Sequence, residues 1–347
     1  MLADELDFVI GIDTHRDTHA LALVEASTGA LVLEREVGAD GPGYRQALAL
    51  ADGRAPGARV WAIEGTGSYG AGLARFLLAR GERVVEVARP RREGRARAKT
   101  DALDALRAAR TVLARGQLAD PRAGGQREGL RALMTTREGL LKAKRAALCQ
   151  LRALVVACPE PLRAELRTLT RARLLDRLAT LRLDRRGDSE LRGLYLSLRA
   201  LARHAQTLTV EERTFTQEIG AHVDELAPAL LREPGIGPIS AAQLLISWSH
   251  PGRLHSEAAF AHLAGAAPIP ASSGQTVRHR LDPGGDRQLN RALHTIIITR
   301  RKNHDATTAY IERRTAEGKT VREAIRCLKR YLARHLYRLL ERTPLTT

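Results

Sequence analysis

The sequence predicts an α/β domain at the N-terminus followed by a mostly all-α remainder. In residues 1–120 short apolar runs alternate with helical patterns, whereas after residue 121 apolar residues recur at the spacing of one helix face. A chain of 347 residues also exceeds what one hydrophobic core serves. We therefore expect three domains, covering residues 1–120, 121–227 and 228–347.

The first domain is expected to hold five strands and three helices. Strands are predicted at residues 8–13, 19–26, 31–37, 59–64 and 83–87, and helices at residues 43–51, 69–80 and 100–115. The order βββαβαβα is that of the ribonuclease H architecture, shared by RuvC-like nucleases, in which helices flank a mixed sheet. A Rossmann-like domain gives much of the same order, so the order alone does not decide between them.

Long helices are predicted for the middle of the chain. Leucine-rich stripes run through residues 127–156 and 191–226, and few turn residues interrupt them. This pattern is typical of an antiparallel helical hairpin or coiled coil that spaces domains or forms a dimer. A plain helical bundle that packs on its own domain fits the stripes equally well.

The last third opens with a tight turn, Pro234-Gly235-Ile236-Gly237, before an apolar helix for which Ser240 is a candidate N-cap. This is the pattern of a helix–hairpin–helix element, in which glycines let backbone N–H groups approach a phosphate. An ordinary corner between two helices has the same pattern. Gly235 and Gly237 are candidate nucleic-acid contacts on the first interpretation.

The composition points to a polyanionic partner. The chain has 56 Lys and Arg residues against 39 Asp and Glu, for a formal net charge of +17, and this excess favours nucleic acid. Because aromatic residues make up 3% of the chain, base stacking is not expected to be the main binding mode. The three cysteines are widely spaced, the N-terminus is unlike a signal peptide, and no apolar run is long enough to span a membrane. These features predict a cytoplasmic protein without a membrane partner.

Four carboxylates form the candidate catalytic site. Asp13 and Glu64 end the first and fourth predicted strands, which are neighbours in a ribonuclease H sheet, and Asp101 and Asp104 share one helix face because they are three residues apart. Converging carboxylates repel each other unless a cation lies between them, and Mg²⁺ prefers such oxygen ligands. The sequence predicts a magnesium site, in which two ions about 3.5–4 Å apart stabilise both oxygens of a phosphodiester displacement.

Each of these acids alone is explained as well by a turn cap or a helix-terminal charge, and only their joint placement favours a site. His15 and His19 flank Asp13 and are candidates for proton transfer or phosphate contact, although a strand-end histidine is more often structural.

Basic residues are expected to bind nucleic acid beside the acids. One run precedes the second acid pair and other arginines follow residue 274, although such charges are often only solvated. The candidates are Arg89, Arg91, Arg92, Arg95, Arg97, Lys99, Arg278, Arg280, Arg287 and Arg291. Arg300, Arg301 and Lys302 are expected to extend the same basic surface.

Several stretches together resemble one known family. The stretches GIDTH, EGTGSYG and KTDALDA, followed by PGIGPISAAQLL and FAHLAGAAPIPASSGQTVRHRL, resemble the DEDD transposases of the insertion-sequence 110 family. The resemblance covers both ends of the chain in the right order, while the middle fits as a helical spacer. It implies a RuvC-like recombinase in which Asp13, Glu64, Asp101 and Asp104 are the metal ligands.

The resemblance also implies a catalytic serine in a C-terminal transposase domain. The Ser-Gly motif of the family reads Ala271-Ser272-Ser273-Gly274 here, so Ser273 is the expected nucleophile and Ser272 the alternative. The family further implies donor and target DNA, a guide RNA often called a bridge RNA, a homodimer that assembles to a tetramer, and a bacterial, nucleoid-associated location. Composition and spacing do not distinguish RNA from DNA as the partner.

Three functions fit the sequence. The first is a recombinase that forms a covalent phosphoserine link of either polarity, which preserves the energy of the phosphodiester. The second is a hydrolytic, metal-dependent DNA junction nuclease that uses only the acids, and the third is a non-catalytic nucleic-acid-binding scaffold. The complete acid set argues against the scaffold, and the long basic C-terminal part with its Ser-Gly loop argues against a simple junction nuclease.

Overall fold

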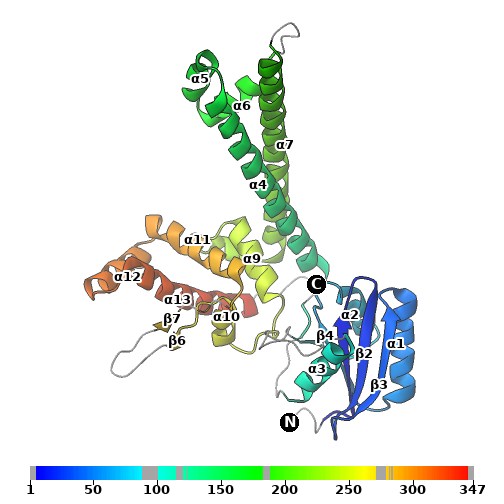
Figure 1. The fold of residues 1–347 in the computed structure, drawn as a ribbon. Helices are drawn as coiled ribbons and strands as arrows, with labels where there is room; N and C mark the ends of the chain where they lie inside the picture. Colours follow the sequence, from blue (N-terminus) through cyan, green and yellow to red (C-terminus); the bar gives the residue numbers. More distant parts are fainter. Residues whose placement is uncertain are drawn as a thin grey trace. The chain divides into compact units, whose positions relative to one another are not determined.

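The chain forms two compact units. The computed structural model describes residues 5–87, 101–114, 120–122, 124–182, 188–270, 279–280, 282 and 284–342. Unit 1 consists of Met1–Gly124 together with Ser249–His255, and unit 2 of Gly125–Trp248 together with Ser256–Thr347. Unit 1 is α/β and unit 2 is mostly helical (Figure 1). The division into three domains remains a prediction.

Unit 1 is built on a mixed sheet of five strands. They are β1 (Phe8–Thr14), β2 (Thr18–Glu25), β3 (Leu31–Gly38), β4 (Arg59–Glu64) and β5 (Val84–Val87), with helices α1 (Gly41–Arg54), α2 (Ala71–Leu78) and α3 (Asp101–Leu113). The strand order is β3-β2-β1-β4-β5, antiparallel among β1, β2 and β3 and parallel among β1, β4 and β5. This sheet is consistent with the predicted ribonuclease H-like fold and confirms that the first and fourth strands are neighbours.

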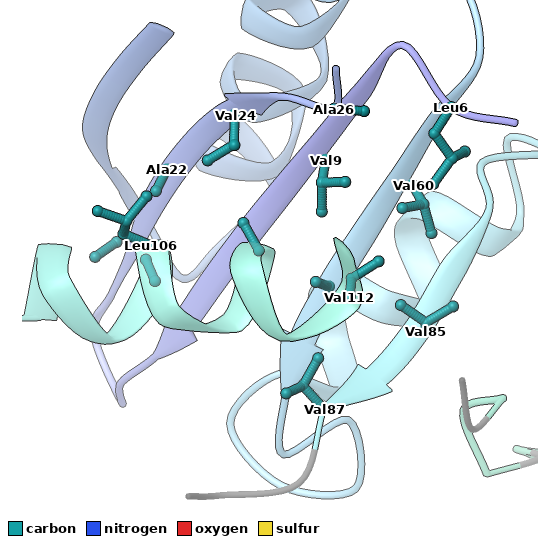
Figure 2. Close-up of a cluster of buried hydrophobic side chains, with 14 residues drawn as sticks. Leu6, Val9, Ala22, Val24, Ala26, Val60, Val85, Val87, Leu106 and Val112 are labelled. Atoms are coloured by element: carbon teal, nitrogen blue, oxygen red, sulfur yellow. The ribbon is translucent and has the colours of Figure 1, made fainter. Parts of the chain in front are cut away.

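Helices cover both faces of this sheet. Alternate side chains of a strand point to opposite faces, so Val9 of β1 packs beneath α3 whereas Ile10 and Ile12 pack with α1 and α2. Figure 2 shows the α3 side, where Leu106 and Val112 of the helix meet small and β-branched residues of the strands. Because β1 is buried on both faces, it forms the centre of the unit.

Helix α3 approaches β1 very closely at Gly11. A Cβ atom at this position would lie 2.0 Å from the backbone oxygen of Ala105 and 2.7 Å from the backbone nitrogen of Ala109. Neither backbone atom can be moved by a side-chain rotation. The absence of a side chain at Gly11 therefore sets how closely α3 approaches β1.

Unit 2 contains ten helices in its described part. They are α4 (Gly125–Ala157), α5 (Glu160–Arg167), α6 (Arg171–Ala179), α7 (Ser189–Leu226), α8 (Pro228–Arg232), α9 (Pro238–Trp248), α10 (Glu257–Leu263), α11 (Arg287–Asn303), α12 (Asp305–Ala316) and α13 (Val321–Arg342). Two short strands, β6 (Ile269–Pro270) and β7 (His279–Arg280), pair antiparallel. Over the described residues of both units, no helix has the length and apolar character needed to cross a membrane.

Helices α4 and α7 form an antiparallel hairpin, with α5 and α6 at one end of it (Figure 1). Gln126, near the start of α4, donates to Glu225 near the end of α7 at 3.2 Å. Farther along α4, Arg137 donates to Glu212 at 2.6 Å and to Thr216 at 2.7 Å. The predicted helical hairpin is thus present, whereas a coiled coil and a role in dimerisation remain predictions.

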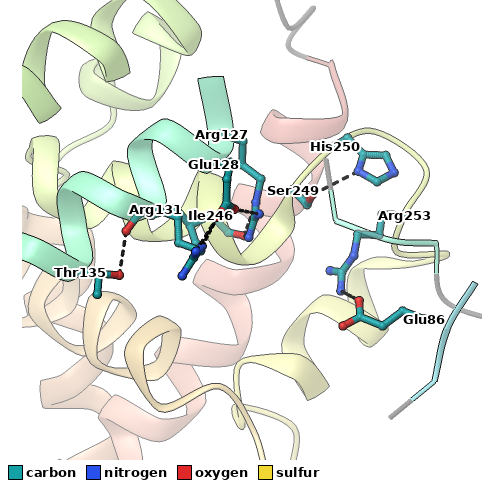
Figure 3. Close-up of polar contacts among 9 residues, drawn as sticks. All are labelled: Glu86, Arg127, Glu128, Arg131, Thr135, Ile246, Ser249, His250 and Arg253. Carbon is teal, nitrogen blue, oxygen red and sulfur yellow. Dashed lines mark hydrogen bonds and ion pairs between the residues drawn. The ribbon is translucent and has the colours of Figure 1, made fainter. Parts of the chain in front are cut away.

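The hairpin is joined to the remaining helices of unit 2 through the end of α9. The buried guanidinium of Arg127 donates two hydrogen bonds, of 2.9 and 3.1 Å, to the backbone oxygen of Ile246 in the last turn of α9 (Figure 3). Such a contact satisfies a carbonyl that has no partner within its own helix. At its other end α9 begins at Pro238, a residue favoured at the first helical position. The prediction of Ser240 as N-cap was therefore wrong, because Ser240 lies inside the helix.

One segment of unit 1 comes from far along the chain. Residues Ser249–His255 follow α9 and belong to unit 1. In this segment Arg253 Nη2 lies 3.8 Å from Oε2 of Glu86 on β5 (Figure 3), with 8% of the Arg253 side chain exposed. Burial lowers the pKa of the Arg253 guanidinium, and the charge of Glu86 opposes that effect. Unit 1 is therefore discontinuous in sequence.

Candidate active site

Two carboxylates lie at the carboxyl ends of adjacent parallel strands. Asp13 follows Gly11 by two residues on β1, so its side chain faces α3, and only 8% of the residue is exposed. β1 and β4 are in register at Gly11 and Ala62, and Glu64 follows Ala62 by two residues. Asp13 and Glu64 therefore share one face at the same edge of the sheet. The hydroxyl of Thr14 donates to the backbone oxygen of Glu64 at 2.9 Å and ties the two strand ends together.

The first turn of α3 brings two more carboxylates to this edge. Asp101 begins the helix and its side chain is 57% exposed, whereas the side chain of Asp104 is 13% exposed. Oδ1 of Asp104 accepts a hydrogen bond of 2.8 Å from Arg107 Nη1. Acids in the first turn of a helix are stabilised by its dipole, so these residues suit the helix end as well as a ligand.

Three side chains converge at the end of β1. His15 Nε2 lies 3.2 Å from Oδ2 of Asp13 and 3.3 Å from Oδ1 of Asp101. One ligand atom from each residue lies within 4.8 Å of the other two, a set that is able to hold a metal ion. Asp13 and Asp101, predicted from sequence to meet, are brought together, and His15 joins them.

Glu64 and Asp104 are not part of this three-residue set among the described residues. Both lie on elements that border it, Glu64 at the end of β4 and Asp104 one turn along α3. The structure thus places all four predicted acids around the carboxyl ends of β1 and β4, with carboxylate oxygens of Asp13 and Asp101 within 4.8 Å of each other. Their role as metal ligands stays a prediction.

The donor set fits a divalent cation. Carboxylate oxygens are preferred by hard ions such as Mg²⁺, and a neutral imidazole nitrogen is a common ligand of first-row transition ions. Two carboxylates this close to each other also benefit electrostatically from a positive charge between them. Ligand atoms of Asp13, His15 and Asp101 lie close enough to one another to share such an ion.

The second candidate histidine, His19, lies on the opposite face of the sheet from Asp13. It is paired with Thr14 across β1 and β2, is fully buried, and stacks on Tyr44 of α1 with ring centroids 5.9 Å apart. Burial lowers the pKa of His19, although a backbone hydrogen bond at Thr18 opposes that shift. Its position matches a structural role rather than contact with phosphate.

The glycine-rich turn before α9 borders an open depression of about 590 Å³, lined by residues 231–240 with Thr295 and Thr299. Gly235 has a φ of +74°, and a Cβ there would lie 2.9 Å from Cγ of Arg300 and 3.0 Å from the backbone oxygen of Ile296. At Gly237 nothing lies within 4 Å of the position of a Cβ. Gly235 is thus explained by packing against α11, whereas Gly237 leaves open backbone beside the depression.

The expectation that Arg300 extends a basic surface was wrong. Its Nε donates to the backbone oxygen of Pro234 at 2.7 Å, and Nη2 lies 3.1 Å from Glu233, with 13% of the side chain exposed. Burial lowers the pKa of this guanidinium, partly offset by Glu233. Arg300 therefore clamps the glycine-rich turn to α11, while Arg301 and Lys302 are exposed.

Of the other candidate nucleic-acid contacts, two are exposed on α11 and one lies in β7. Arg287 and Arg291 are exposed one turn apart on α11, and Arg291 Nη1 lies 3.4 Å from Glu138 of α4. Arg280 is described only as part of β7. Several candidates lie outside the described residues, namely Arg89, Arg91, Arg92, Arg95, Arg97, Lys99, Ser272, Ser273 and Arg278.

Comparison with known proteins gives two family matches. A model of DEDD transposases of the IS110 type, described as "Transposase", matches residues 10–160, and a model described as "Transposase IS116/IS110/IS902 family" matches residues 227–312. A protein of Streptomyces coelicolor, described as "Insertion element IS110 uncharacterized 43.6 kDa protein", is 31% identical over 144 residues, which cover 41% of this chain and 36% of that relative. The first match includes the acid cluster and the second the glycine-rich turn and Ser273.

Proposed function

Because the chain belongs to the IS110 family of transposases, we propose that it cuts and rejoins DNA as the transposase of an insertion sequence. The observation that carries the proposal is the convergence of Asp13 and Asp101, with Glu64 and Asp104 beside them, at the carboxyl ends of two parallel strands. Acids gathered on one edge of a ribonuclease H-like sheet suit phosphodiester chemistry, because a divalent ion held there stabilises charge on the reacting oxygens.

Asp13, Glu64, Asp101 and Asp104 are proposed to hold Mg²⁺, as two ions per site. The support is chemical: four carboxylates within two strand ends and one helix turn form an oxygen-rich, negatively charged edge. Gly11 supports this arrangement by letting α3 approach β1. Asp13 is nearly buried, so its carboxylate is held in place by its surroundings rather than by solvent.

Ser273 is proposed as the nucleophile, with Ser272 as the alternative. Its hydroxyl oxygen would bond to phosphorus while the phosphorus bond to one DNA oxygen breaks, and that oxygen would leave as a hydroxyl after taking up a proton. The resulting phosphoserine ester keeps the energy of the phosphodiester, so a different DNA hydroxyl can reverse the reaction without ATP. The serine is far from the acids in sequence, and such a reaction requires folding or a second subunit to bring them together.

DNA and a guide RNA are the proposed partners. The net charge of +17 suits both, and the open backbone at Gly237 and the exposed Arg287 and Arg291 are candidate phosphate contacts. A homodimer through the α4–α7 hairpin, which pairs to a tetramer during strand exchange, and a nucleoid-associated location in the bacterial cytoplasm belong to the same proposal.

A trapping assay tests the proposed chemistry. Purified protein, Mg²⁺, end-labelled DNA that carries the junction of the element, and the co-transcribed RNA are incubated and separated on a denaturing gel, beside Ser273→Ala, Ser272→Ala and Asp104→Ala. We expect a protein–DNA adduct that is lost in Ser273→Ala and Asp104→Ala and kept in Ser272→Ala. Loss in Ser272→Ala alone would move the nucleophile to that residue.

Two other results would contradict the proposal. Cleaved ends without an adduct, still dependent on Asp104, would leave a hydrolytic junction nuclease. Binding without any cleavage, at the same affinity in wild type and variants, would leave a nucleic-acid-binding scaffold.

A further inference from the structure

His15 is a side chain near the candidate site that the proposed DEDD ligand set does not include. Its Nε2 contacts carboxylates from two different elements, Asp13 of β1 and Asp101 of α3, at 3.2 and 3.3 Å. This nitrogen therefore lies on the side of both carboxylates from which they would contact a shared cation. Ligand atoms around one ion at 2.0–2.3 Å lie within about 4.6 Å of one another, close to the 4.8 Å limit that the three residues satisfy.

The backbone explains why His15 points there. β1 ends at Thr14, and the amide of His15 then donates to the backbone oxygen of Thr18 at 3.0 Å, which closes a tight turn into β2. His15 follows Asp13 by two residues, so both side chains emerge on the α3 side. The imidazole is 47% exposed, which leaves the site accessible. His19 lies on the other face of the sheet and cannot replace it.

An imidazole changes the metal chemistry of such a site. Carboxylates alone suit Mg²⁺, which demands oxygen ligands and keeps much of its water. A nitrogen donor adds affinity for first-row transition ions, among which Mn²⁺ is the weakest binder. It adds little affinity for Mg²⁺. The same pair of carboxylates with a nitrogen beside them therefore discriminates between ions of equal charge.

We propose that His15 is a metal ligand that sets the ion preference of this site, raising its affinity for Mn²⁺ over Mg²⁺. The proposal rests on the proposed function in that it concerns the same acid cluster, but it requires only that the cluster binds a divalent ion. The alternative explanation is that His15 merely screens the repulsion between Asp13 and Asp101 in the metal-free chain.

The test uses the full chain and the metal ions alone. Binding of Mn²⁺ and of Mg²⁺ is measured by calorimetry at neutral pH for wild type, His15→Ala, His15→Asp and Asp13→Asn. His222→Ala is the matched control, because His222 is a partly exposed histidine of α7 in unit 2. Pulsed electron paramagnetic resonance of bound Mn²⁺ then detects nitrogen coupling from a coordinated imidazole. Far-UV circular dichroism establishes that each variant is folded.

We expect nitrogen coupling in wild type and in His222→Ala, and its loss in His15→Ala. Mn²⁺ affinity should fall roughly 10–100-fold in His15→Ala, the range found for weakened metal sites, while Mg²⁺ affinity changes by less than about 3-fold. His15→Asp should restore binding without the coupling and favour Mg²⁺. Asp13→Asn should weaken both ions.

Bound Mn²⁺ without nitrogen coupling in wild type, or an equal loss of Mn²⁺ and Mg²⁺ affinity in His15→Ala, would overturn the proposal. These results are independent of the DNA assay. An adduct that forms on DNA while His15→Ala binds Mn²⁺ normally would refute the role of His15 alone. Nitrogen coupling in a protein that forms no adduct would instead refute the transposase chemistry alone.

Discussion

Acidic side chains have different neighbours in the two units. In unit 2, Glu212 lies 2.6 Å from Arg137 and 3.7 Å from Lys144, and Glu233 lies 3.1 Å from both Arg300 and His335. Each of these acids is paired with an arginine from a helix distant in the sequence. At the edge of the sheet in unit 1, by contrast, carboxylates lie near other carboxylates.

Asp13 and Asp101 approach each other through His15, and the next acids, Glu64 and Asp104, border the same place. Carboxylates placed this closely repel one another, and a cation bound between them would offset that repulsion. We therefore expect the paired acids Glu212 and Glu233 to stabilise the fold of unit 2, and the converging acids of unit 1 to be stabilised by a bound cation. Neutralising an acid should therefore affect stability in opposite directions at these two places.

The largest effect is expected at Gly11, which makes the acid cluster possible. In Gly11→Ala the new methyl group would collide with backbone atoms of Ala105 and Ala109, so α3 must move away from β1. Overpacking of this kind costs about 3 kcal/mol or more, and divalent-ion binding should be lost with it. Urea unfolding of unit 1 can be followed by Trp61 fluorescence in a Trp248→Phe background, because these are the two tryptophans of the chain.

The matched control is Gly53→Ala in α1, where nothing lies within 4 Å of the added atom. This helical glycine should gain roughly 0.5–1 kcal/mol on substitution. Equal stability of the two variants would show that the close approach of α3 and β1 is not a constraint.

The next largest effect is expected where an acid is matched by cations. Glu212→Gln removes a partner of Arg137 and Lys144 and should cost unit 2 about 2 kcal/mol, the magnitude of a hydrogen bond to a charged group. Glu211→Gln, at the exposed neighbouring position, should change little. The measurement is urea unfolding followed by helical circular dichroism.

The same residue predicts a pH dependence. Burial raises the pKa of Glu212. The hydrogen bond from Thr216 and the charges of Arg137 and Lys144 lower this pKa by more than burial raises it, so the net shift is downward from 4.5. A carboxyl with a depressed folded pKa contributes stability above its unfolded pKa and loses it as pH falls through the folded value. The loss of stability below pH 4.5 should therefore be shallower in Glu212→Gln than in wild type, and parallel curves would argue against this ion pair.

A smaller effect separates two glycines that look alike in sequence. Gly235→Ala should cost about 1–2 kcal/mol, because a left-handed backbone disfavours a side chain and Arg300 lies against it. Gly237→Ala should leave stability unchanged but weaken DNA binding roughly tenfold if its backbone contacts a phosphate, equivalent to about 1.4 kcal/mol. Thermal unfolding and fluorescence anisotropy with labelled DNA measure the two outcomes. Unchanged DNA affinity in Gly237→Ala would make the turn a purely structural corner.

The smallest and opposite effect is expected at the acid cluster itself. Asp13→Asn removes one of the converging charges and should stabilise metal-free unit 1 by up to about 1 kcal/mol, while binding of divalent ions falls. Asp17→Asn, whose carboxylate pairs with Arg16 at the exposed turn, is the control. A clear loss of stability in metal-free Asp13→Asn would mean that this carboxylate is a folding element like Glu212.

Features that depend on local pattern could be predicted from the sequence. Alternation and turn residues located all five strands of unit 1 within one residue, and the meeting of strand ends at Asp13 and Glu64 followed from their order. The helical spacing in α4 and α7 predicted long helices in a hairpin or coiled coil, but it did not distinguish these from a plain helical bundle.

Features that depend on distant contacts could not be predicted. Gly11 and Gly235 carry no sign in the sequence that a helix backbone or Arg300 will lie against them. Arg300 stands in a run of three cations with Arg301 and Lys302, so the sequence suggested a basic surface for all three. His15 offered one usable signal, its position two residues after Asp13 on the same strand face, but its contact with Asp101 required the placement of α3.

The return of Ser249–His255 to unit 1 means that the chain passes between the two units three times, after Gly124, Trp248 and His255. No single cut divides such a protein into two complete parts. A fragment that stops at residue 124 lacks Arg253 and so leaves Glu86 without that partner. A shortened gene copy would thus encode an incomplete α/β unit, and a protease that nicks one crossing would leave two fragments that are held together by the non-covalent contacts of the unit they share. Truncation at any of the three crossings therefore leaves at least one unit incomplete.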